Sequence, residues 1–498
     1  MRTFPLFNWL KQFKSRLIRA PTKHPGLQKL AQLPRKSLPR FVQECPVAMK
    51  YLDLLGRLGW SHFPERPDQR FALDVAPLPY TCLVATYLVK IEQHLTYVAD
   101  LRVYLVEHPA LVWVLGFPLK PSAEYSWGFD ADASLPTHRH LSRMLRDLPN
   151  ACLQFLLDET VCLIQAELTN QLNAGCRFGD CMSMDTKHII AWVKENNPKA
   201  YIEGKRYDKT KQPAGDPDCK LGCKRKHNQR KKTESVEAIP IPTPTKDAIP
   251  AKHVKADEYY WGYGSGVVAT KVPDWGEFVL AELTQTFDHS DVSYFKPLME
   301  QVERRLGCKP SYGAFDAAFD AFYVYEYFDP EKGYAAVPFV ERGGARDRQF
   351  SADGSPKCAA GKPMVLRYTF WCKTTLIPHE RARYVCPLHY PEKTAQACPA
   401  NDEHWSKKGC VTTIAASIGA RLRYQIDRGS QQYKDVLKQR TATERINSQA
   451  VDLGIERPKL RNEASITNHN TLTYVLINLH ALQRVRQRKA ERKQAQTA

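Results

Sequence analysis

The chain has 498 residues, of which 43% are hydrophobic and 25% charged. This is the composition of a globular protein with a sizeable core, and at roughly 100–200 residues per domain the length predicts two to four domains. Lysine and arginine number 72 against 53 acidic residues, so the formal net charge is +19. Such a surplus predicts a polyanionic partner, above all nucleic acid, because phosphate neutralisation releases counterions. A basic protein without such a partner is the alternative.

Two classes of protein are excluded by simple patterns. No stretch reaches the ~20 apolar residues of a membrane-spanning helix, and the best run, 110–119, is expected to be a buried element. The first 20 residues are basic and amphipathic without the continuous apolar segment of a secretory signal, so we expect a surface helix there. Fourteen cysteines in such a chain argue against a disulfide scaffold.

Residues 1–175 are expected to form a mainly helical domain that binds DNA, pairs with another protomer, or does both. Apolar residues recur at helical spacing over 80–105. Pro136 and Thr137 form a start signal for a helix that continues to about residue 170.

Residues 176–340 read as the first part of an α/β core. A strand over 181–192 is followed by a basic, proline-rich loop, 194–257, which either lies along DNA or is simply solvated. Its basic run includes Lys224, Arg225 and Lys226, which we predict to bind DNA. The pattern then predicts, in order, strands at 266–270 and 278–286 joined by a turn, a helix at 293–306, a strand at 311–316, a helix at 319–328 and a strand at 334–340.

Residues 341–428 differ in character and read as an inserted, β-rich module with five cysteines. Cys386, Cys398 and Cys410, with His389 and His404, are loosely typical of zinc ligands. Zinc sites usually contain tight cysteine pairs, which this module lacks, so free thiols are the alternative. Residues 429–498 complete the core, with a helix at 433–453 that stops at a glycine and a last helix at 471–490 that ends in a basic tail.

Three acidic residues have settings that suggest chemistry. Asp185 lies inside a predicted strand, where aspartate is disfavoured. Asp316 lies where a strand gives way to a helix, the edge at which the active sites of open α/β sheets gather. Glu444 lies on a helix one turn after Arg440, which can hold its carboxylate. Phosphodiester exchange by two Mg²⁺ ions needs such carboxylates. An ion pair or a helix cap explains each acid taken singly.

The segments around these acids resemble the three motifs of bacterial insertion-sequence DDE transposases. The matching segments are residues 183–187 (Ser-Met-Asp-Thr-Lys), 312–321 (Tyr-Gly-Ala-Phe-Asp-Ala-Ala-Phe-Asp-Ala) and 440–448 (Arg-Thr-Ala-Thr-Glu-Arg-Ile-Asn-Ser). The resemblance implies an RNase H-like mixed-sheet α/β core, interrupted by a β-rich insertion and preceded by the helical domain.

The same resemblance implies an activity and its site. Asp185, Asp316 and Glu444 would hold two Mg²⁺ ions, or Mn²⁺, with Asp320 as the rival for the second position. Arg440 and Arg445 are expected to contact DNA. The enzyme would cut at terminal inverted repeats and join the ends to target DNA, as a homodimer in the active complex, in the bacterial cytoplasm at the nucleoid.

Two positions depart from the family's fuller signature. Leu437 stands where the family has tyrosine, and Val451 stands where it has lysine. Two alternatives therefore remain. One is an inactive or non-enzymatic basic DNA-binding protein with a zinc-stabilised module. The other is an RNase H-like nuclease that hydrolyses DNA without strand transfer.

Overall fold

The computed structural model describes residues 26–66, 78–172, 177–224, 258–340, 348–400 and 408–497. The surface helix expected at the N-terminus lies outside the described residues. So does much of the basic loop, including Arg225 and Lys226. Among the helices that are described, none combines the length and the apolar character needed to cross a membrane.

Residues 26–172 are mainly helical wherever they are described. The helix expected to start at Thr137 begins there, with the Thr137 hydroxyl accepting from the backbone N–H of His140 at 3.2 Å. The helix predicted over 80–105 is two helices separated at 93–97, and the helix predicted from Thr137 to about residue 170 is two helices separated at Leu148-Pro149. The helices are α2 (Leu27–Gln32), α3 (Arg40–Gln43), α4 (Pro46–Leu55), α5 (Tyr80–Glu92), α6 (Val98–Glu107), α7 (Pro109–Leu115), α8 (Ala131–Ser134), α9 (His138–Asp147) and α10 (Asn150–Leu168), with a small pair of strands, β1 (Lys120–Pro121) and β2 (Phe129–Asp130).

A mixed six-stranded sheet forms the centre of the molecule, so the α/β class predicted from the sequence is confirmed. Its path runs β4-β5-β3-β7-β8, and β6 also pairs with β5. The parallel strands are β3, β7 and β8, whereas β5 runs antiparallel to β3, β4 and β6. The bounds are β3 (Cys181–Ile190), β4 (Lys220–Lys224), β5 (Glu258–Val272), β6 (Gly276–Thr286), β7 (Tyr312–Ala314) and β8 (Tyr334–Ala336). Because β4 falls inside the predicted loop, that part of the loop prediction was wrong.

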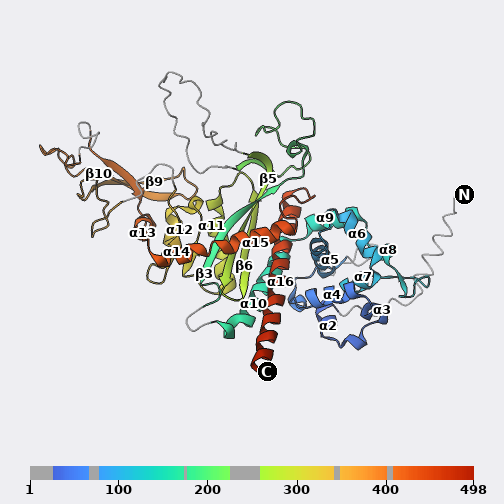
Figure 1. The fold of residues 1–498 in the computed structure, drawn as a ribbon. Helices are drawn as coiled ribbons and strands as arrows, with labels where there is room; N and C mark the ends of the chain where they lie inside the picture. Colours follow the sequence, from blue (N-terminus) through green and yellow to red (C-terminus); the bar gives the residue numbers. More distant parts are fainter. Residues whose placement is uncertain are drawn as a thin grey trace, which may run out of the picture.

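Helices cover both faces of this sheet (Figure 1). On one face lies α11 (Phe295–Leu306), whose Leu298 packs near Gly266 of β5. A Cβ at Gly266 would lie 2.4 Å from the Tyr294 ring, so only glycine permits this close approach. On the other face lie α15 (Thr441–Asp452) and α16 (Glu463–Thr497), with α10 against α16.

The last helix, α16, is longer than the predicted helix 471–490 because it begins eight residues earlier, at Glu463, and continues seven residues further, to Thr497. Its backbone N–H at Glu463 donates to Asp218 at 3.0 Å. The first turns contain Thr467, Asn468, His469 and Asn470, which look solvated in sequence but are largely buried in the fold. Asn468, for example, donates to the carbonyls of Leu145 and Leu148 at 2.7 and 2.8 Å.

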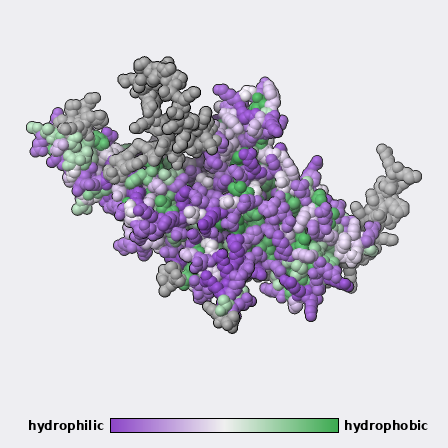
Figure 2. Space-filling view, viewed as in Figure 1, coloured by the Kyte–Doolittle hydropathy of each residue, from purple (hydrophilic) through white to green (hydrophobic). Residues whose placement is uncertain are grey.

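The insertion is a separate antiparallel sheet of order β11-β10-β9 that projects from the body (Figure 1). It enters the chain between β8 and α14. Its elements are β9 (Val365–Cys372), β10 (His379–Val385), β11 (Val411–Ala415) and α13 (Gly419–Gln425), followed by α14 (Gln431–Lys438). The predicted helix 433–453 is in fact α14 and α15, separated at Gln439 and Arg440. Much of the face seen in Figure 2 is hydrophilic.

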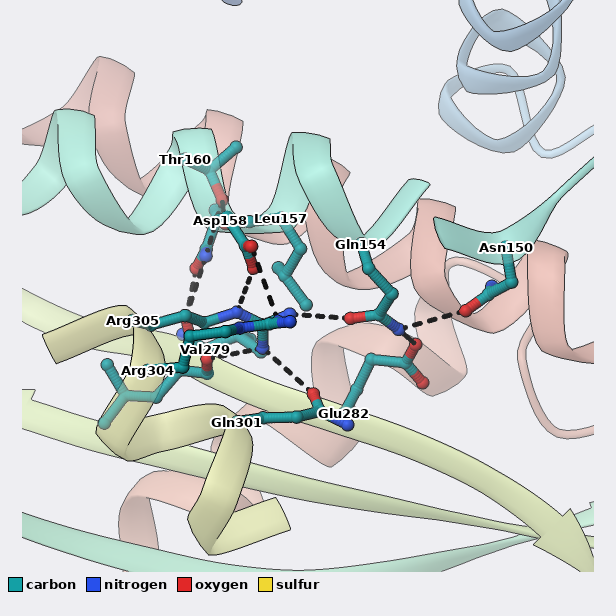
Figure 3. A network of polar contacts seen from close by, with 12 residues as sticks. Asn150, Gln154, Leu157, Asp158, Thr160, Val279, Glu282, Gln301, Arg304 and Arg305 are labelled. Atoms are coloured by element: carbon teal, nitrogen blue, oxygen red, sulfur yellow. Dashed lines mark hydrogen bonds and ion pairs between the residues drawn. The ribbon is translucent and has the colours of Figure 1, made fainter. Parts of the chain in front are cut away.

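A buried polar network joins the N-terminal helices to the sheet (Figure 3). Arg305 of α11 is its centre, with a side chain only 1% exposed that pairs with Asp158 of α10. The guanidinium also donates to Gln154 at 2.6 Å and to the Leu280 carbonyl at 2.8 Å. Gln154 in turn donates to Glu282 of β6 at 2.6 Å. Elements far apart in sequence are thus tied together through Arg305 and Glu282, which are buried, and through Gln154 and Asp158, which are partly buried.

Glu282 makes the stability of this network depend on pH. Burial raises the pKa of Glu282 from 4.5 to about 7. The native protein therefore holds this proton in a range where the unfolded chain has lost it, so stability falls as pH rises from about 4.5 to 7. Between pH 5 and pH 8, the free energy of unfolding of the wild type should fall by on the order of 2–3 kcal/mol more than that of Glu282→Gln.

Urea denaturation at the two pH values measures this difference. Glu300→Gln, which removes a carboxylate from the exposed side of α11, controls for the loss of one negative charge. Parallel pH profiles for the wild type and Glu282→Gln would contradict the prediction.

Candidate functional site

Two predicted site residues meet at the level of the sheet where β7 ends beside the middle of its parallel neighbour β3. The pairing of β3 with β7 places Ser183 opposite Ala314. Two residues further along each chain come Asp185 and Asp316, so both carboxylates lie at the same level of the sheet. Asp185 is still in β3, opposite Val267 of β5, whereas Asp316 follows the end of β7. The strand register alone thus brings together residues 131 positions apart.

The electrostatics of this pair are those of carboxylates that lack a sufficient counter-charge. Burial, together with the negative charges of Asp316 and Asp291, raises the pKa of Asp185 from 3.8 to about 6. Burial and the charge of Asp291 also raise the pKa of Asp316. Backbone N–H groups oppose these shifts, since Thr186 donates to Asp185 at 2.9 Å and Ala318 donates to Asp316 at 2.9 Å. A nearby cation would allow both carboxylates to ionise fully.

Helix α15 crosses the sheet and contacts β3, β5 and β6 (Figure 1). Positions 440, 444 and 447 follow the i, i+4, i+7 spacing of one side of a helix. Asn447 donates from its side-chain nitrogen to Asp185 Oδ2 at 3.0 Å. This bond shows that the side of α15 on which Asn447 lies faces β3. The other flank carries Arg445, which pairs with Glu277 of β6. Glu444 therefore lies on the side of α15 that faces β3.

Glu444 itself is held by a different partner. Its Oε1 lies 2.6 Å from Arg440 Nη2, and its side chain is 47% exposed. The positive charge of Arg440 also lowers the pKa of both Asp185 and Asp316. Arg440 is thus the counter-charge shared by all three predicted carboxylates.

The three carboxylates do not form a ready-made ligand set in this conformation. Within the part of the chain that the structure describes, no three His, Cys, Asp or Glu side chains are grouped closely enough to hold a metal ion. Asp185 and Asp316 are neighbours, but Glu444 would have to leave Arg440 to join them. Chemically, the oxygen donors here are of the kind that Mg²⁺ and Mn²⁺ prefer.

Asp320, the rival for the second position, has a structural role. Its side chain is 1% exposed and pairs with Arg423 of α13, whose Nε donates to Asp320 Oδ1 at 2.7 Å. The Tyr325 hydroxyl and the Val340 backbone N–H also donate to it, at 2.7 and 3.0 Å. These bonds keep the pKa of Asp320 below its usual value, although burial acts in the opposite direction. Asp320 thus fastens the insertion to the core.

Two residues of the site were missed by sequence reasoning. Asp291, at the start of the turn before α11, accepts from the Thr186 hydroxyl at 2.6 Å. No local pattern marks it, because its position depends on how the loop after β6 folds. Asn447 carried a weak signal. It follows Glu444 by three residues, and asparagine is disfavoured inside helices.

The residues predicted to bind DNA are distributed over the sheet edge and α15. Lys224 is exposed at the end of β4, and Arg445 is 59% exposed beside Glu277. Arg440 is half-buried over the aspartates. Arg225 and Lys226 lie outside the described residues.

The predicted zinc ligands are not assembled. Among the described residues, Cys386, Cys398 and Cys410 do not belong to any group of three His, Cys, Asp or Glu side chains that could hold a metal ion. Gly409 packs against Cys386 and His389, so those two side chains are near each other. His404 lies outside the described residues. Zinc binding by this module therefore stays a prediction, and reduced thiols stay the alternative that the cysteine spacing favours.

Comparison with known proteins gives no family for this chain, so its function is inferred from the motifs and the geometry of the site. No protein-family model, no curated protein and no solved structure matches the chain.

Proposed function

We propose that this protein is a DNA transposase that cuts DNA at the terminal inverted repeats of an insertion sequence and joins the ends to target DNA. One observation carries the proposal. Asp185 lies within β3 beside Asp316, which follows the end of the adjacent parallel strand β7, and both lie below the flank of a helix that bears Glu444. This is the arrangement that the three sequence motifs lead us to expect.

The order of the strands supports the proposal. Read from β6, the sheet runs β6-β5-β3-β7-β8, with the first two pairings antiparallel and the last two parallel. An RNase H-like core has this order. The insertion enters between β8 and α14, which is between the second aspartate and the glutamate, as the resemblance to DDE transposases implies.

The residues present suit a divalent cation. Asp185, Asp316 and Glu444 would hold Mg²⁺ or Mn²⁺. Burial and, to a smaller extent, neighbouring negative charges raise the pKa of the two aspartates, and a bound cation would offset both effects. When bound, two such ions activate the attacking oxygen and stabilise the leaving oxygen of a phosphodiester. Glu444 must exchange Arg440 for the cation. The released guanidinium is then available to a DNA phosphate, which it binds in bidentate fashion.

DNA is the partner that the charge favours. The chain carries +19, and the exposed Lys224 and Arg445 add local positive charge near the sheet edge and α15. Because two DNA ends must be brought together, we propose a homodimer as the active complex, acting at the nucleoid.

The departures from the family signature leave the carboxylates untouched but alter the surroundings of the DNA. Leu437 is half-buried on α14, and Val451 packs against the core from α15. Neither can replace the polar side chain that the family places there, so Arg440 would take a larger share of the phosphate contacts.

A strand-transfer assay tests the proposal and separates its alternatives. The substrate is a DNA fragment that carries the sequences flanking the coding region on both sides, offered with a target plasmid and Mg²⁺ or Mn²⁺. We expect cation-dependent cuts at the fragment's repeats and covalent joining to the plasmid. Cutting without joining would indicate a nuclease. Binding without cutting would indicate a DNA-binding protein and would contradict the proposed activity.

A further inference from the structure

Asn447 is the side chain of α15 that touches the candidate site directly. It is 8% exposed, and its Nδ2 donates to Asp185 Oδ2 at 3.0 Å. Asparagine is unfavourable inside a helix, so its presence on the buried side of α15 needs a reason outside the helix. The bond to Asp185 is the contact that could supply one.

Of the two polar atoms of the Asn447 amide, the nitrogen is hydrogen-bonded within the described part of the chain and the oxygen is not. Among the described residues, Asn447 Oδ1 is buried without a hydrogen-bond partner. Asn478 of α16, by contrast, uses both ends. Its Oδ1 accepts from the Val279 N–H at 2.9 Å, and its Nδ2 donates to Val279 O at 2.9 Å and to Thr160 at 3.0 Å. An unsatisfied buried amide oxygen costs about 1–3 kcal/mol, so Asn447 is poorly explained as a residue retained for stability.

The contact also links two predicted cation ligands. Asn447 follows Glu444 by three residues on the same flank of α15, so its bond to Asp185 holds that flank over β3. Hydrogen bonds to ligating carboxylates set their orientation, and losing such a partner typically weakens metal affinity by about 10–100-fold.

We propose that Asn447 is a positioning residue of the cation site, which orients the Asp185 carboxylate and holds the Glu444 flank of α15 against β3. The inference rests on the proposed function, because it concerns the same site. It assigns to the site a residue that none of the three sequence motifs singled out as functional.

Binding of Mn²⁺ alone to the full chain, measured by calorimetry without DNA, tests this role. Asn447→Leu keeps the branched shape of the side chain and removes the amide. We expect it to bind Mn²⁺ at least about tenfold more weakly than the wild type. Asn478→Leu is the matched control, since it removes a buried amide remote from Asp185. It should bind Mn²⁺ like the wild type although its unfolding midpoint falls. Asn447→Ala provides a second variant if Asn447→Leu does not fold.

The outcomes separate the inference from the function on which it rests. Wild-type affinity in the folded Asn447 variants would overturn the inference and leave the proposed function standing. If Asn447→Leu and Asn478→Leu weakened Mn²⁺ binding equally, Asn447 would have only a structural role, and the inference would be overturned as well. A wild-type chain that binds no Mn²⁺ would remove the proposed cation site itself, and the inference with it.

Discussion

Asp185→Asn should abolish cation-dependent DNA cutting and joining, with a rate loss on the order of a thousandfold or more, while the fold remains intact. Catalysis is lost because the neutral amide cannot help to hold two divalent cations beside a phosphate. Stability should stay the same or rise, since the substitution removes one of the negative charges that now repel one another near Asp316 and Asp291. Cleavage rates with Mg²⁺ and Mn²⁺, together with the thermal unfolding midpoint, measure the two effects.

Asp180→Asn is the matched control for this result. Asp180 immediately precedes β3, at the opposite end of the strand from the site, and accepts from Ser311 at 2.7 Å. Its substitution should leave the cleavage rate within a few-fold of the wild type. The assignment of Asp185 would be wrong if Asp185→Asn retained substantial cleavage, or if both substitutions reduced cleavage equally.

Arg305→Ala should give the largest loss of stability, about 3–5 kcal/mol in the free energy of unfolding. The guanidinium is the buried centre of the network in Figure 3, where it meets Asp158, Gln154 and the Leu280 carbonyl. Removing it takes the buried donor away from Gln154, the Leu280 carbonyl and Asp158 at once, and it leaves a cavity where the 1% exposed side chain stood. Chemical denaturation, followed by both fluorescence and circular dichroism, measures the loss.

The neighbouring arginine offers a matched control for this second prediction. Arg304 also pairs with Asp158, at 3.4 Å, but its side chain is 61% exposed. Exposed ion pairs contribute about 0–1 kcal/mol, so Arg304→Ala should have little effect. Equal losses from Arg304→Ala and Arg305→Ala would show that burial is not what makes the network important.

Local patterns were sufficient for the main elements of the fold. The alternation of residues 181–190 indicated β3, the two β-rich runs about residues 273–276 indicated the β5–β6 hairpin, and a left-handed Gly454 ended α15. These features depend on neighbours in sequence. The errors arose where contacts with residues distant in sequence determine the secondary structure. The loop prediction missed β4, which exists only because β5 pairs with it. The start of α16 was missed because its polar residues find partners in other helices.

The candidate site divides in the same way. The types and settings of Asp185, Asp316 and Glu444 were readable from the chain, because a carboxylate inside a strand or at its end is locally unusual. Which acids meet was decided only by tertiary structure. Strand register brings Asp185 beside Asp316. Asp320, in contrast, is bonded by Arg423 of the insertion helix α13 and is therefore not available to the site. The pairing of Arg440 with Glu444 was readable from the sequence, because the two residues are four apart on one helix. The bond from Asn447 to Asp185, in contrast, follows from how α15 packs on β3, and contacts between distant segments have no period in the sequence that could reveal them.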